Sequence, residues 1–181
     1  MSIPSGLRDL SKMEFYKNAV RIRKLVDLWL IREFGIKKNP RSVRQVIKEI
    51  SDEDQKLIDE ICVKYGVNPN KSYNSEYPEW YLEDEKKLVK TYTGRLIYYI
   101  VQANKLHPQY DFEWQQRRQA QNEAIGIVQN IYVEIEHIKS MFDVSLKFTE
   151  DLIDALDHEE DLLKGWRQSD NKRRKEKGSV C

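Results

Sequence analysis

The chain has 181 residues, a formal net charge of +1 and 34% charged residues, with only seven Gly and five Pro. This length suits one ordinary domain, and the composition favours long helices with wetted surfaces over a strand-and-turn architecture. No apolar run approaches the roughly 20 residues that span a bilayer, and residues 1–6 lack the apolar core of a signal peptide. A cytoplasmic protein that does not enter a membrane is therefore expected.

The first predicted helix covers residues 12–34. Residues 11–14, Ser-Lys-Met-Glu, have the form of a capping box, in which a hydroxyl and a Glu satisfy free backbone N–H groups at a helix start. The closing residue is predicted at Phe34-Gly35, because glycine usually adopts the left-handed turn after a helix. The apolar positions recur every three or four residues, as a helix face requires: Phe15, Ala19, Ile22, Val26 and Leu30.

Residues 37–78 are less regular and are predicted to form a helical insertion or lid. Residues 42–49 could make two helical turns, and Ser51 is expected to cap a short helix over residues 52–65 that stops at Gly66. Residues 67–77 have loop composition. Cys62 falls in the apolar pattern of the short helix and is predicted to be a small buried hydrophobe, while Cys181 ends the sequence, so no structural disulfide is expected.

Three further long helices are predicted over residues 78–107, 112–141 and from about residue 146, with Asp111 as the cap of the second. The short links at residues 108–111 and 143–145 predict antiparallel neighbours, so residues 1–168 are expected to form an antiparallel four-helix bundle. Residues 169–181 form a basic C-terminal tail, which is either a frayed extension of the last helix or a disordered segment.

The sequence offers little for catalysis, and neither an enzyme nor a bound cofactor is expected. It has no G-x-S-x-G, no G-x-G-x-x-G and no other glycine-rich phosphate loop. Glu134 and His137 have the E-x-x-H spacing of carboxylate-bridged metal bundles, but a second copy of that motif is missing and His137 falls off the predicted core face. A metal enzyme built on these two residues remains a minor alternative.

Charge is distributed unevenly along the chain. Residues 8–48 have twelve Lys and Arg against four acids, residues 134–161 have ten acids against two Lys, and residues 164–177 have seven Lys and Arg against two acids. Either these charges are solvated helix faces that partly neutralise one another, or they form a basic surface made by the first helix and the tail. The second interpretation requires both regions to converge on one exposed patch.

Basic side chains displace counterions from a phosphate backbone, and an aromatic among them can stack on a base. Trp166 could equally complete the core of the last helix. The candidate nucleic-acid-binding residues are Arg21, Arg23, Lys24, Arg117, Arg118, Trp166, Arg167, Lys172, Arg173, Arg174 and Lys175.

The order of these features resembles a known family. Residues 10–19 (LSKMEFYKNA), residues 32–36 (REFGI) and residues 162–167 (LLKGWR) with the basic tail are similar to the accessory variability determinant (Avd) proteins of diversity-generating retroelements. That family is itself similar to the bundle proteins of ribosomal-RNA intervening sequences. The resemblance implies a non-catalytic homo-oligomer, typically a pentamer, that binds a reverse transcriptase and its template RNA in support of mutagenic cDNA synthesis. The alternative is an oligomeric helical scaffold that does not bind nucleic acid.

Overall fold

The structure is a computed structural model that describes residues 10–32, 34, 51–68, 79–142, 144 and 149–178, and it is all-α. None of the helices described has an apolar stretch long enough to cross a membrane. The chain divides into two compact units, Lys37–Glu83 and the combination of Met1–Ile36 with Asp84–Cys181. The elements are η1 (Leu10–Lys12), α2 (Glu14–Ile31), α4 (Asp52–Lys64), α5 (Glu79–Lys105), α6 (Asp111–Met141) and α7 (Glu150–Gly178).

The smaller unit contains α4, whose two ends confirm the predicted signals. Ser51 Oγ accepts a hydrogen bond from the Asp54 backbone N–H at 3.2 Å, so Ser51 caps the helix. Gly66 follows the helix in the left-handed region with φ +66°, which costs glycine little. Cys62 is buried and is not in a disulfide, as predicted. The turns expected at residues 42–49 and most of the predicted loop, residues 69–77, lie outside the described residues.

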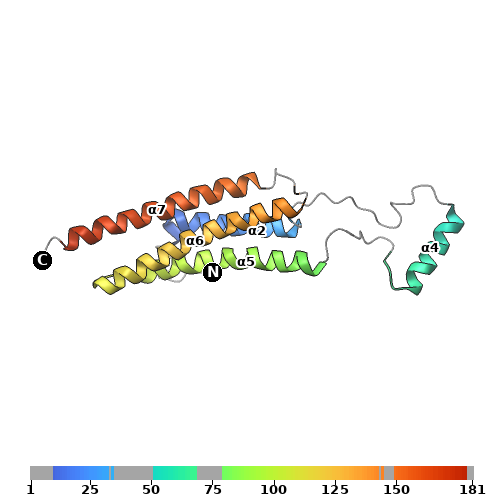
Figure 1. Ribbon diagram of the computed structural model, residues 1–181, viewed down its shortest axis with the longest axis horizontal. Helices are drawn as coiled ribbons and strands as arrows, with labels where there is room; N and C mark the ends of the chain where they lie inside the picture. Colours follow the sequence, from blue (N-terminus) through green and yellow to red (C-terminus); the bar gives the residue numbers. More distant parts are fainter. Residues whose placement is uncertain are drawn as a thin grey trace. The chain divides into compact units, whose positions relative to one another are not determined.

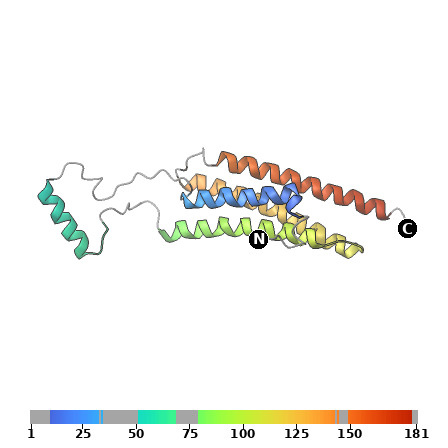
Figure 2. The ribbon, with the colours of Figure 1, turned by 180° about the vertical axis from the view of Figure 1, so that it is seen from behind.

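The larger unit is a helical bundle in which α2, α5, α6 and α7 lie side by side (Figures 1 and 2). α7 packs against both α2 and α6. Phe15, near the start of α2, stacks on Trp166, whereas Asn18 contacts Ala155 and Glu159, so α2 and α7 run in opposite directions. Figure 1 shows that α6 and α7 both extend past the beginning of α2.

The predicted apolar faces form the core of this unit. In α2 every residue of the predicted face is buried, and Trp29 joins it. The buried apolar residues of the other three helices recur at helical spacing, as expected when one stripe of each helix faces the interior. They are Val89, Leu96, Ile100 and Ala103 on α5, Ala124, Ile127, Val128, Ile131, Ile135 and Ile138 on α6, and Leu152, Ala155, Leu156 and Leu163 on α7.

Several predicted helix ends are wrong. Ser11 lies in η1, and α2 begins at Glu14 after Met13, which makes no side-chain capping bond, so the predicted capping box does not form. α2 ends at Ile31, before the predicted end, and Phe34 has left-handed geometry (φ 59°), whereas the predicted capping residue Gly35 lies outside the described residues. The Phe34 ring is buried with its centroid 4.8 Å from that of Trp29, and this packing holds it in a conformation that is costly for a non-glycine residue.

The later helices also differ from the prediction at their ends. Asp111 is the first residue of α6 rather than its cap, and the capping position belongs to Tyr110. α7 begins at Glu150 rather than near residue 146, and residues 145–148 lie outside the described residues.

Residues 169–178 continue α7, so the first of the two alternatives for the basic tail, a helical extension, describes this segment. Seven acids and no Lys or Arg occupy residues 150–161, while residues 164–176 have six Lys and Arg against two acids. Acids near the beginning of a helix and cations near its end both interact favourably with the helix dipole. The sequence of acids first and cations last therefore stabilises α7, and it also gives the two halves of the helix surfaces of opposite charge.

A buried carboxyl group lies between α2 and α7. Glu159 has no exposed surface, and its Oε2 accepts a hydrogen bond from Asn18 Nδ2 at 2.9 Å. Its other oxygen, Oε1, has no partner among the described residues. Burial raises the pKa of Glu159 to about 8, although the hydrogen bond from Asn18 opposes part of that change. The carboxyl group is therefore largely protonated at neutral pH.

This raised pKa predicts a pH-dependent stability. Glu159 binds a proton more tightly in the folded chain than in the unfolded chain, where its pKa is near 4.5. Its stabilising contribution is complete below pH 4.5 and is lost as pH rises through about 8, with a slope of at most about 1.4 kcal/mol per pH unit. The variant Glu159→Gln, which stays neutral and can still accept from Asn18, should lose this slope in urea denaturation measured across pH 5–9. If the unfolding free energies of Glu159→Gln and of the unaltered protein changed equally with pH, Glu159 would not be the group responsible.

Candidate nucleic-acid interface

Arg117 and Asp170 form a buried ion pair between α6 and α7. Arg117 Nε is 2.6 Å from Asp170 Oδ2, and Arg117 Nη1 donates to the Leu106 carbonyl oxygen at 2.7 Å. Gln121 Nε2 donates to the same Asp170 oxygen at 2.7 Å. Both charged side chains are thus satisfied by several hydrogen bonds, which a buried ion pair needs if it is to offset its desolvation. Arg117 is 9% exposed, so the prediction that it faces phosphate is wrong.

Trp166 belongs to the same interior assembly. Its ring stacks on Phe15 with centroids 4.3 Å apart and planes 10° apart, and the Arg117 guanidinium lies 5.2 Å from its centroid. With one face against Phe15 and a cation beside the ring, Trp166 has little surface for a nucleotide base. Of the two roles predicted for it, the structure supports packing.

Five of the six remaining candidates of α6 and α7 lie where the end of α7 is beside the beginning of α6. Arg118 is exposed on α6, and Lys172, Arg173 and Lys175 are exposed on α7. Arg118, Arg174 and Lys175 line one open hollow of about 410 Å³ together with Asn171. We call the five cations Arg118, Lys172, Arg173, Arg174 and Lys175 the basic end.

Two of the predicted arginines are tied to neighbouring side chains. Arg174 Nη2 is 3.0 Å from the exposed carboxylate of Asp111, at the first residue of α6. Arg167 Nη1 donates to Asn122 Oδ1 at 2.7 Å, one turn or more away from the basic end along α7. The pair with Asp111 is solvent-exposed and therefore weak, so it leaves Arg174 available to a stronger anion.

An open cleft of about 950 Å³ adjoins the basic end. Its walls come from the start of α2, the α5–α6 connection, the start of α6 and the end of α7, and they carry His107, Gln109, Arg173 and Glu176. Arg117 and Asp170 close its inner side. The lining of the cleft combines charged side chains of both signs with a larger share of apolar surface.

The basic residues of α2 do not reach the basic end. Arg21, Arg23 and Lys24 are exposed, but Asn18 already lies level with residues 155–159 of α7. Because the two helices are antiparallel and rise 1.5 Å per residue, these three side chains lie about 30 Å along the bundle from Lys172–Lys175. The prediction that helix one and the tail form one patch is therefore wrong, and the α2 residues lie beside the acidic half of α7.

Two exposed aromatic residues at the basic end were missed from the sequence. Tyr110 is 65% exposed and Phe112 is 58% exposed, and their rings stack with centroids 6.0 Å apart. Glu113 Oε2 accepts from the backbone N–H groups of Gln109 (2.7 Å) and Tyr110 (3.1 Å), and these bonds lower the pKa of Glu113. The signal in the sequence was an aromatic pair on either side of Asp111, outside the apolar seam of α6.

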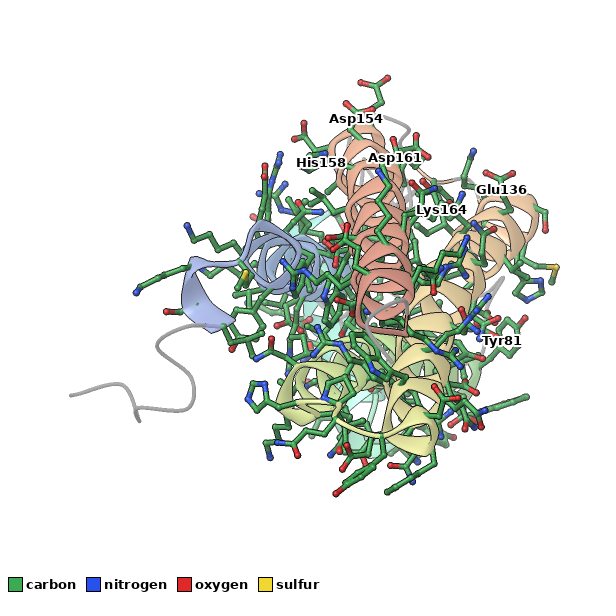
Figure 3. The ribbon with its side chains drawn as sticks, turned by 90° about the vertical axis from the view of Figure 1, so that its left-hand side faces the viewer. Tyr81, Glu136, Asp154, His158, Asp161 and Lys164 are labelled. Carbon is green, nitrogen blue, oxygen red and sulfur yellow. The ribbon has the colours of Figure 1, made fainter. Side chains whose placement is uncertain are left out.

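The outer side of α7 carries a separate acidic surface. Asp154, His158 and Asp161 point away from the bundle on this helix (Figure 3), and all three are exposed. His158 Nε2 is 3.3 Å from Glu14 Oε1 of α2. This surface occupies the half of α7 that precedes the basic end, so one helix presents two surfaces of opposite charge.

Glu134 and His137 lie near a third titratable residue, Glu85 of α5. His137 Nε2 is 3.8 Å from Glu85 Oε1. Burial raises the pKa of Glu134, the charge of Glu85 raises it further, and His137 lowers it. Across the described residues, no group of three His, Cys, Asp or Glu side chains is arranged to hold a metal ion.

The chain matches no protein-family model, no curated protein and no solved structure.

The buried ion pair gives a stability prediction. Asp170→Asn should leave Arg117 charged and uncompensated in the interior, which costs about 3–5 kcal/mol of unfolding free energy. The double variant Arg117→Met/Asp170→Leu should recover most of that loss, because it removes both charges and fills the space with apolar atoms. Urea denaturation measures both, with Arg118→Ala as an exposed control expected to change stability by less than about 0.5 kcal/mol. An unfolding free energy of Asp170→Asn equal to that of the unaltered protein would show that the ion pair is not needed for stability.

Proposed function

We propose that this chain is a cytoplasmic, non-catalytic accessory protein that binds nucleic acid with the basic end. The observation that carries the proposal is the grouping of Arg118 of α6 with Arg174 and Lys175 of α7 around one open hollow. Lys172 and Arg173 are exposed on the same turn of α7, and Arg173 also lines the adjoining open cleft. Cations grouped in this way attract a phosphate backbone by releasing its condensed counterions. Four of the five follow one another directly in α7, and a helix of this length presents them without the entropy loss of ordering a flexible tail.

The finer part of the proposal follows the family resemblance. A bundle of four antiparallel helices with an insertion after the first would serve, as Avd proteins do, as a homo-oligomeric partner of a reverse transcriptase and its template RNA. The basic end would contact the RNA. In this arrangement the acidic surface of α7 faces away from the RNA and remains available to a basic protein. A polymerase that binds nucleic acid carries a basic surface, which an acidic surface such as that of α7 would attract.

The acidic surface also supports a second candidate function, an oligomeric scaffold that does not bind nucleic acid. Asp154 and Asp161, with the exposed acids Glu150, Asp151 and Asp157, could contact a basic partner without any contribution from the basic end. The two functions make opposite predictions for RNA binding, so one titration separates them.

The test is the salt dependence of binding to a short fluorescent RNA, measured by anisotropy between about 50 and 200 mM salt. Replacing Lys172, Arg173, Arg174 and Lys175 together by Ala should flatten the slope of log affinity against log salt by about 3, since each phosphate contact on a single strand contributes about 0.7.

The matched control replaces Lys17, Arg21, Arg23 and Lys24 of α2 by Ala. It removes the same charge from an exposed helix face about 30 Å away along the bundle and should change the slope by less than 1. Equal losses in the two variants would mean that net charge alone drives binding. Absence of RNA binding by the unaltered chain would favour the scaffold.

A further inference from the structure

We propose that Tyr110 and Phe112 form a base-stacking platform, which makes single-stranded nucleic acid the ligand of the basic end. This inference rests on the proposed function and narrows its ligand. The two residues flank the first residue of α6, and their rings are nearly parallel, with an interplanar angle of 9°. More than half of each side chain is exposed. Rings presented in this way offer π-faces to a ligand without any rearrangement of the core.

The backbone beneath the two rings is fixed in advance. Glu113 accepts hydrogen bonds from two consecutive backbone N–H groups before the helix, those of Gln109 and Tyr110. A carboxylate that accepts from such N–H groups holds the entry of a helix in one conformation. A platform that is ordered before binding loses little conformational entropy when a base stacks on it.

Charge at the same position favours a nucleotide over an apolar protein segment. Asp111 lies between the two aromatic residues in sequence and is ion-paired with Arg174, and Arg174 shares an open hollow with Arg118 and Lys175. Bases on the rings and phosphates on these cations would use both features together. Exposed aromatic side chains next to grouped cations are the arrangement by which proteins bind single strands.

A duplex could not use the rings in this way. The faces of paired bases are covered by their neighbours in the stack, so only a single strand, a loop or an end can place a base against a side chain. The cations would contact the backbone of a duplex or a single strand alike. Loss of the rings should therefore weaken binding of single strands selectively.

The carboxylate of Asp111 adds a second, opposite expectation. It competes with phosphate for Arg174, and its own charge repels a strand that crosses the rings. The variant Asp111→Asn removes the competitor and the repulsion while keeping a similar shape. It should bind single strands more tightly than the unaltered protein.

The experiment compares a single-stranded oligouridine with an RNA hairpin stem of equal phosphate number, both followed by anisotropy at one salt concentration. The double variant Tyr110→Leu/Phe112→Leu keeps the apolar contact but lacks π-faces. It should lose about 5- to 150-fold in affinity for oligouridine for each stacked base removed, with no more than a twofold change for the stem. The exchanged variant Tyr110→Phe/Phe112→Tyr is the matched control and should bind both ligands normally.

Several results would overturn this inference. Unchanged oligouridine binding by the leucine variant, or an equal loss for both RNAs, would exclude stacking while leaving binding by the cations intact. Failure of Asp111→Asn to tighten oligouridine binding would show that the strand does not cross this end. If size-exclusion chromatography showed the leucine variant dissociating an oligomer with RNA binding unchanged, the rings would belong to a contact between copies of the chain. If the unaltered protein bound neither RNA, the proposed function would fail together with this inference.

Discussion

The organisation of the bundle end depends on the layered contact of Phe15, Trp166, Arg117 and Asp170. It joins α2, α6 and α7 and, through the Leu106 carbonyl, the connection between α5 and α6. A buried charge pair contributes little net stability, but loss of either partner is costly, so it favours one arrangement of the helices over its alternatives. That single arrangement determines the neighbours of Arg118 and Arg174. The exposed cations therefore keep their positions because the buried pair keeps its own: Arg117 directly precedes Arg118, and Asp170 lies about one turn before Arg174.

Periodicity was a reliable guide to the interior of this chain. The stripe of α2 from Phe15 to Leu30 is buried as predicted, because an apolar repeat of three to four residues leaves a helix only one way to face the core. The helix ends were not predictable in the same way. Ser11 could have capped α2, but whether a hydroxyl reaches a free N–H group depends on the path of the preceding chain, and that path forms η1. Local signals decide such ends only when no tertiary contact competes.

The candidate site was predicted only in part, for a reason visible in the sequence. Arg117 precedes Gln121 by four residues on the buried stripe of α6, and Asp170 follows Leu163 by seven on that of α7, so both occupy core positions. The charges of Arg117 and Asp170 suggested that both residues lie on the surface, whereas their spacing along the helices indicated buried positions. In the structure both residues are buried. The distance between the α2 cations and the basic end could not be obtained from sequence at all, because it depends on how far α7 extends beyond its partner helix.

The opposite charges of the two halves of α7 have a consequence for encounters in solution. Their centres are separated by about 22 Å along one rigid helix, at 1.5 Å per residue, so the helix carries an electric moment far larger than its net charge suggests. The field of a polyanion exerts a torque on this moment. The torque turns the basic end of α7 toward the polyanion before contact and turns the acidic half away from it. A nearly neutral protein can thereby approach a charged polymer in one preferred orientation, and added salt weakens that alignment as it shortens the range of the field.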